Sequence, residues 1–244
     1  MKILLAPSET KAIGGTANLN LNTLLFSELT SLRQKLLHTY INLLQQNNFT
    51  VLSKMFGLKK ESDINTHRKE IVHELTMKAI ERYTGVAFDY LDYHNLNREA
   101  QTYIDKNVIL CSNLFGFLRA DDMIPEYRLK QGEAIGDLKP DKLYQEQSHL
   151  LEAYLEDEDI LDLRAGFYDK FYKPKKAYTT LKFIKEGKVV SHWAKAYRGL
   201  VLQAVAKANV QTLNEFMQLA IENLSIEEIQ SKKNKTEIIY SIKP

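Results

Sequence analysis

The sequence contains one cysteine, Cys111, among its 244 residues. A single thiol excludes a disulfide framework and any zinc or iron–sulfur site built from several cysteines. A reducing cytosol permits this composition, so we expect a cytoplasmic protein rather than a secreted one. The segment Met1 to Pro7 has too few apolar residues for a signal peptide. No run approaches the roughly 20 apolar residues that cross a bilayer, and we expect no membrane partner.

Linkers, repeats and low-complexity tracts are also absent, and proline and glycine number only five and ten. Nothing in the composition therefore divides the chain, and we predict one domain over residues 1–244. Hydrophobic residues make up 44% of the sequence and charged residues 26%. That apolar fraction excludes intrinsic disorder as the main state.

Three apolar runs have the length and flanks of buried strands, at residues 2–6, 107–112 and 160–163. Two β-rich runs over 183–191 are divided by Glu186-Gly187, where glycine supplies the positive φ of a hairpin turn. Strands and helices do not alternate as a regular βαβ series. We therefore predict the α+β class: a single compact domain with a mixed β-sheet flanked by helices.

Helices are predicted where apolar residues recur at steps of three and four, over 22–47 and 195–207. A shorter pattern begins at Val51, is interrupted at Gly57, and resumes from Ile71 to Ala79 after a polar stretch. We expect this region, within 50–80, to form a helix, a turn and a second helix.

The net charge of only +2 conceals an uneven distribution. Residues 168–200 hold nine basic and two acidic residues, a net charge of +7, and the rest of the chain carries −5. Aromatic residues lie between these lysines, as in surfaces that bind nucleic acid. The alternatives are a solvated face, or a basic face that meets an acidic partner, which the acidic run 152–162 itself supplies. The residues expected to hold phosphates are Lys173, Lys175, Lys176, Lys195 and Arg198.

A loop with polar residues follows the first predicted strand. Ser8 and Lys11 have the S-x-x-K spacing in which a lysine activates a serine hydroxyl, and both are catalytic candidates. A phosphate contact and simple helix capping are the other interpretations. The P-loop and dinucleotide-binding motifs are absent. His192 is a candidate general base or a hydrogen-bonded strand histidine.

Polar residues also cluster after the second predicted strand. Ser112 and Asp122 are further catalytic candidates, and Arg119 and Arg128 have the chemistry to hold an anion. An internal ion-pair cluster is the alternative. Together with the first loop they allow an enzyme acting on a nucleotide, a nucleobase or another small anion, for example a glycosidic-bond hydrolase. No cofactor motif is present, and no His and carboxylate set suggests a metal site.

An ordered set of short motifs covers the chain from end to end. In this ordered combination the sequence resembles the YaaA family of bacterial peroxide-stress proteins. The motifs are Ala6-Pro7-Ser8-Glu9-Thr10-Lys11, Tyr83-Thr84-Gly85, Ser112-Asn113-Leu114-Phe115-Gly116-Phe117-Leu118-Arg119 with Asp122, Tyr127-Arg128-Leu129, Lys142-Leu143-Tyr144, Lys173-Pro174-Lys175-Lys176 and Arg198-Gly199.

The resemblance implies a compact domain whose basic cleft binds double-stranded DNA with little sequence specificity. It also implies a cellular role in limiting DNA damage by peroxide and free iron. A further implication is a helix-hairpin-helix over 52–68, with Gly57, Lys59 and Lys60 at its turn, where backbone N–H groups and lysines hold phosphates. One departure is Glu9, which stands where the family loop commonly has lysine.

Overall fold

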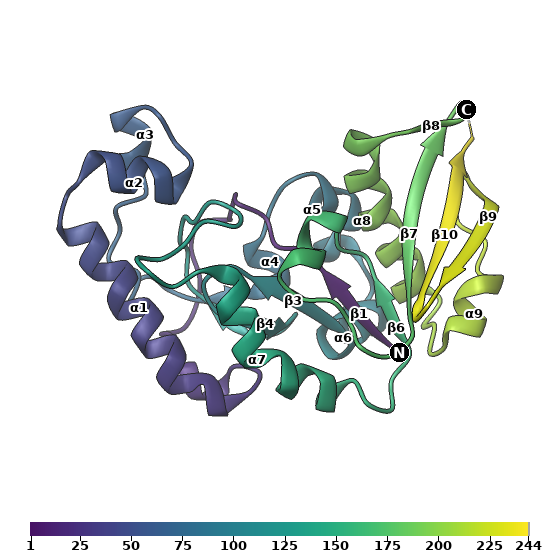
Figure 1. Ribbon diagram of the computed structural model, residues 1–244, viewed down its shortest axis with the longest axis horizontal. Coiled ribbons are helices and arrows are strands. Elements are labelled where there is room, and N and C mark those ends of the chain that lie inside the picture. Colours follow the sequence, from purple (N-terminus) through teal and green to yellow (C-terminus); the bar gives the residue numbers. More distant parts are fainter. Residues whose placement is uncertain (244) are drawn as a thin grey trace.

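The computed structural model describes residues 1–243, and only the backbone of Ser191 and His192. An eight-stranded sheet forms its centre (Figure 1). Five adjacent strands are parallel, and the other three pair antiparallel with their neighbours. In spatial order the strands are β4 (Gly116–Arg119), β3 (Val108–Ser112), β1 (Lys2–Leu5), β6 (Ile160–Asp162), β7 (Tyr178–Lys185), β10 (Lys235–Ile242) and β9 (Leu224–Lys232), with β8 (Lys188–Val189) paired to β7.

The predicted single domain with a mixed sheet flanked by helices is confirmed, but its class is α/β rather than α+β. The difference arises because β10, at the end of the chain, pairs in parallel with β7 and extends the parallel group. The strands predicted at 2–6, 107–112 and 160–163 are confirmed as β1, β3 and β6.

Helices cover both faces of the parallel strands. Ile3 and Leu5 of β1 belong to one core and Leu4 to the other, which explains why these strands are almost continuously apolar. Helices α5 (Val86–Leu91), α6 (Arg98–Asn107) and α8 (Ser191–Lys207) pack into the first core, and α7 (Pro140–Tyr154) supplies most of the helical residues of the second. The helix predicted over 195–207 is thus confirmed as part of α8. No helix in the described part of the chain meets the length and apolarity that a bilayer span requires.

Smaller elements complete the domain. Two short strands, β2 (Met77–Lys78) and β5 (Met123–Ile124), pair with each other away from the main sheet. Two further α-helices are α4 (Ala79–Arg82) and α9 (Leu213–Gln218). Four short 3-10 helices are η1 (Leu21–Thr23), η2 (Ser27–Leu29), η3 (Tyr93–Asn95) and η4 (Gly166–Lys170).

A helical arm lies at the end of the molecule distant from β9 and β10 (Figure 1). It consists of α1 (Thr30–Gln45), α2 (Phe49–Phe56) and α3 (Glu61–Thr66). The helix predicted over 22–47 therefore begins later than expected. Two 3-10 turns precede it because Phe26 has a positive φ of 62° and the Leu25 N–H donates to the Asp122 carboxylate instead of to a helical carbonyl.

The first half of the predicted helical hairpin is confirmed as α2, which the Asn48 side chain caps and Gly57 ends with a φ of 68°. The prediction of a second helix from Ile71 to Ala79 is wrong. Residues 71–75 form turns, and the Thr76 N–H and carbonyl bond to the loop at Thr16 and Ala17. The helix that follows α2 is instead α3, so a helical pair spans 49–66 rather than 50–80.

The predicted hairpin over 183–191 is confirmed. It joins β7 to β8, and Glu186 and Gly187 occupy its turn with φ of 51° and 72°. Helix α8 begins directly after β8, and its Gly199 allows a very close approach to α5. A Cβ atom on Gly199 would overlap the Ala87 carbonyl oxygen.

Candidate functional site

The carboxyl ends of β1 and β6 lie side by side at a topological switch point. The chain continues from β1 to β3 on one side and from β6 to β7 on the other. Open α/β sheets bind ligands at such points because the diverging loops leave a crevice. A cavity of about 500 Å³ occupies this position. Most of its lining residues come from segments 5–10, 84–88 and 163–168 and from α8, and include Ser8, Lys195 and Arg198. Arg128 and Gln131 complete the lining.

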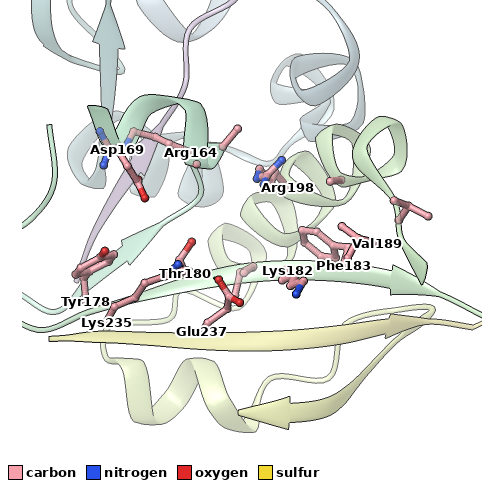
Figure 2. A pocket seen from close by; sticks show the side chains of 15 residues that line it. Arg164, Asp169, Tyr178, Thr180, Lys182, Phe183, Val189, Arg198, Lys235 and Glu237 are labelled. Atoms are coloured by element: carbon pink, nitrogen blue, oxygen red, sulfur yellow. Dashed lines mark hydrogen bonds and ion pairs between the residues drawn. The ribbon is translucent and has the colours of Figure 1, made fainter. Parts of the chain in front are cut away.

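A second cavity, of about 280 Å³, lies over the extended part of β7 and β10 (Figure 2). Ala165 and Arg198 line both cavities, so we call the two together the cleft. Among the charged residues that line the cleft, six are basic and three acidic: Arg128, Arg164, Lys182, Lys195, Arg198 and Lys235 against Glu9, Asp169 and Glu237.

Helix α8 presents two cations to the cleft. Neither Lys195 nor Arg198 forms an ion pair or a side-chain hydrogen bond with any described residue. Arg198 is partly buried, and its guanidinium carbon lies 6.0 Å from the Phe183 ring centroid. Burial lowers the pKa of Arg198 from its usual value. An anion in the cleft would therefore meet a partly desolvated guanidinium, which binds more strongly than a hydrated one.

Lys11 lies beneath the first loop, against two tyrosine rings. Its Nζ atom is 3.9 Å from the Tyr127 ring centroid and 5.1 Å from that of Tyr83. It donates to the carbonyls of Ser8 and Glu9 at 3.2 and 3.3 Å. Burial, followed by the charge of Arg128, lowers the pKa of Lys11 to about 7.

Ser8 lines the cleft, but the arrangement differs from a serine–lysine pair. Its hydroxyl lies 3.0 Å from the Thr10 hydroxyl and accepts the Thr10 N–H at 3.2 Å. The Lys11 ammonium contacts the Ser8 main-chain carbonyl rather than the hydroxyl. The geometry is that of a polar turn at the wall of the cleft rather than of a serine activated by a lysine.

Ser112 is fully buried and belongs to a hydrogen-bond network inside the fold. Its hydroxyl lies 2.9 Å from the Tyr127 hydroxyl, which lies 2.7 Å from that of Tyr83. It also accepts the N–H groups of Leu114 and Phe115. Ser112 therefore stabilises the turn between β3 and β4 and does not face the cleft.

Asp122 and Arg119 lie near the amino ends of the parallel strands, opposite the cleft, because Arg119 pairs with Ile109 at the start of β3. The Asp122 carboxylate accepts the Leu25 and Arg119 N–H groups, both at 2.9 Å, and contacts the Arg119 guanidinium at 3.3 Å. This matches the alternative of an internal cluster that fixes a loop. The structure thus separates these two residues from Ser8 and Lys11.

Arg128 remains at the cleft. Its guanidinium donates to the Glu9 carboxylate at 2.9 Å and to the Phe56 carbonyl at 3.0 Å. The other Glu9 oxygen accepts the Gln131 N–H. Glu9, at the loop position where lysine is common in the resembling family, therefore ties the first loop to Arg128 and neutralises it.

Comparisons with known proteins show which family the chain resembles. The family model described as "Peroxide stress protein YaaA" matches residues 1–230. The chain belongs to the YaaA family. It is 44% identical to an uncharacterized protein of Campylobacter jejuni over 99% of each chain. It is 31% identical to a UPF0246 protein of Corynebacterium glutamicum over 98% of this chain and 100% of that protein.

The YaaA-like segment Lys173-Pro174-Lys175-Lys176 lies just before the amino end of β7, and none of its residues lines either cavity of the cleft. The Lys176 ammonium donates to the carbonyls of Leu155, Glu156 and Glu158, at the end of α7 and just beyond it. Glu152 accepts the Lys175 N–H at 3.1 Å. Residues of the acidic run 152–162 thus lie against this segment, but each of these contacts involves a main-chain group rather than an ion pair between side chains. Lys173 and Lys175 are exposed beside the run.

Lys59 and Lys60 are exposed on the connection between α2 and α3, at the arm. The basic residues predicted to bind DNA or another anion therefore occupy four separate places: the arm, the loop before β7, the cleft, and, for Arg119, the opposite end of the parallel strands. The side chain of His192 lies outside the described residues. Among the described residues, no group of three or more His, Cys, Asp or Glu side chains is placed to hold a metal ion.

Sequence reasoning missed several residues of the cleft, above all Arg164, Asp169 and Tyr178. Arg164 pairs with the buried Asp162 carboxylate at 2.7 Å, and the other two line the smaller cavity. The available signal was weak: Asp162 lies in a predicted strand and Arg164 directly after it, at a strand end where polar residues gather.

Proposed function

We propose that this YaaA-family protein protects DNA during peroxide stress by binding its phosphate backbone in the cleft. The observation that carries the proposal is that Lys195 and Arg198 face the cleft without an acidic partner among the described residues. Phosphate contacts from such residues position a duplex without reading its bases. The proposed binding therefore has little sequence specificity.

The helical arm supplies a second contact in this proposal. Gly57 turns the chain between α2 and α3, and Lys59 and Lys60 beside it are exposed. In a helix-hairpin-helix, such a turn holds a phosphate through backbone N–H groups and lysines. The proposed protection from iron and peroxide is indirect, since a bound protein shields the DNA that it covers.

The test is the affinity of the purified protein for a short DNA duplex, measured by fluorescence anisotropy. Arg198→Ala should weaken binding about tenfold, the usual effect of losing a charged hydrogen bond. Lys175→Ala is the matched control, because Lys175 is also a basic residue of the +7 segment but lies away from the cleft. Equal losses in both variants, or none in Arg198→Ala, would contradict the proposal.

The alternative of an enzyme acting on a small anion has one observation in its favour. The larger cavity, at about 500 Å³, has the size of a small-molecule pocket. However, Ser112 and Asp122 are held inside the fold, so catalysis would depend on Ser8, Lys11 and the cleft residues. Release of product from nucleotides incubated with the protein tests this alternative, and loss of that activity in Lys11→Met would support it.

A further inference from the structure

The smaller cavity contains a buried hydroxyl with no hydrogen-bond partner. Tyr178 lines this cavity and is 3% exposed, and its hydroxyl oxygen is unpaired among the described residues. Buried hydroxyls are nearly always hydrogen-bonded, because an unpaired one opposes folding. Because Tyr178 also lines a cavity, a ligand in that cavity can supply the missing partner.

Other polar groups face the same space. Figure 2 shows the side chains of Asp169 and Thr180 on either side of the space that the Tyr178 hydroxyl faces. Neither makes a side-chain hydrogen bond to another described residue. On β10, Lys235 pairs with Glu237 at 2.9 Å along the same wall. This part of the cavity thus offers both donors and acceptors, which suits a ligand with several hydroxyl or amino groups.

Another part of the wall is apolar. Phe183, Val189, Val190 and Ala194 form it. The Phe183 ring is stacked with Tyr197 and with Tyr240, at centroid distances of 5.6 and 6.2 Å, and is itself only 1% exposed. The apolar atoms of a ring-shaped group would therefore pack mainly against Val189, Val190 and Ala194.

Arg198 connects this cavity to the rest of the cleft. It lines both cavities and has no acidic partner among the described residues, so an anionic group attached to the ring would meet it at their junction. We propose that the smaller cavity binds the organic part of a small phosphate ester, a nucleotide or a sugar phosphate, with its phosphate on Arg198. Tyr178 and Asp169 bind the hydroxyl or amino groups of that ligand.

The test is calorimetric titration of the full chain with the four nucleoside 5′-monophosphates, ribose 5-phosphate and inorganic phosphate. At least one ester should bind tenfold or more tightly than inorganic phosphate. Comparing the nucleotides with ribose 5-phosphate shows whether the bound ligand is a nucleotide or a sugar phosphate. No ester binding more tightly than inorganic phosphate would overturn the proposal.

Two tyrosine variants show whether the Tyr178 hydroxyl is a binding group. Tyr178→Phe should weaken binding of the preferred ester about tenfold. Tyr240→Phe is the matched control, because the Tyr240 hydroxyl is also buried and unpaired among the described residues but does not line the cavity. Its affinity should equal that of the wild type, and unchanged affinity in Tyr178→Phe would contradict the proposal.

Melting temperatures separate a binding role from a structural one. Both variants remove an unpaired buried hydroxyl, so neither should melt below the wild type; a large drop for Tyr178→Phe would show an internal partner and overturn the proposal.

Ester binding shares Arg198 with the proposed DNA binding, but the Tyr178 hydroxyl belongs to ester binding alone. Tyr178→Phe should therefore retain wild-type DNA affinity, which makes the failures of the two proposals distinguishable.

Discussion

Lys11 shows how strongly local surroundings change the chemistry of one residue. A lysine in water keeps its proton to about pH 10.5, but burial and the neighbouring Arg128 lower the pKa of Lys11 to about 7. The amine therefore changes its charge in the physiological pH range. Burial is the largest cause of the shift; the Arg128 charge adds to it and the Glu9 charge opposes it.

We predict that the dimethylated Lys11 amine, followed by carbon-13 NMR, titrates near pH 7. Glu9→Gln should lower its pKa further, and Arg128→Gln should raise it, because each substitution removes a charge of opposite effect. Lys11→Arg identifies the signal by deleting it. A Lys11 signal that titrates near pH 10 would contradict this account.

The same shift predicts a pH dependence of stability. Between pH 7 and 10.5 the unfolded chain binds more protons at this position than the folded chain does. The free energy of unfolding therefore rises with pH through this window. Urea unfolding at several pH values should show the rise in the wild type and a flatter profile in Lys11→Gln. Identical profiles would show that Lys11 is not responsible.

Ser112 provides the contrasting residue, whose role is structural. Ser112→Ala removes the acceptor of the buried Leu114 and Phe115 N–H groups. Since each unpaired buried group is costly, we expect the free energy of unfolding to fall by about 2 kcal/mol, measured by urea denaturation. DNA affinity of the folded variant should not change. A stable variant with lost affinity would instead place Ser112 in the binding site.

At the scale of elements, the position of α8 decides where Lys195 and Arg198 lie. The helix reaches α5 closely only because residue 199 is glycine, whose missing Cβ would meet the Ala87 carbonyl oxygen. In most helices a glycine-to-alanine change is stabilising by about 1 kcal/mol. At Gly199 we expect the opposite effect, a destabilisation, because α5 and α8 pack too closely to leave room for a methyl group.

Gly199→Ala should lower the free energy of unfolding by about 2 kcal/mol, as expected when a packed interface is overfilled. Gly166→Ala is the matched control, since a Cβ at Gly166 meets nothing within 4 Å, and its effect should stay within about 0.5 kcal/mol. Thermal or urea unfolding of the two variants gives the comparison. Equal stabilities would show that α5 and α8 can move apart freely.

Element patterns in the sequence were informative where the signal was local. The apolar runs predicted β1, β3 and β6, and Glu186-Gly187 predicted the turn before β8. The helix expected from Ile71 was wrong because Thr76 bonds to a loop about sixty residues away in sequence. Pairing of β10 with β7 is equally non-local, so no pattern within either segment indicates the α/β class.

For the whole molecule, the +7 segment illustrates the difference between charge along a chain and charge in space. Folding directs Lys176 to the end of α7 and leaves Lys175 beside the acidic run, whereas Lys195 and Arg198 reach the cleft. Sequence alone indicated which residues are basic but not which would be free. Only the fold distinguishes them, because their partners come from distant segments.

We have proposed that the cleft binds DNA phosphates through Lys195 and Arg198. The most direct test of this proposal is the slope of the logarithm of the DNA-binding constant against the logarithm of salt concentration. Each lost phosphate contact reduces that slope by about 1. We expect the slope of the Lys195→Ala, Arg198→Ala double variant to be smaller by about 2 and that of Lys175→Ala to equal the wild-type slope. An unchanged slope in the double variant would contradict it.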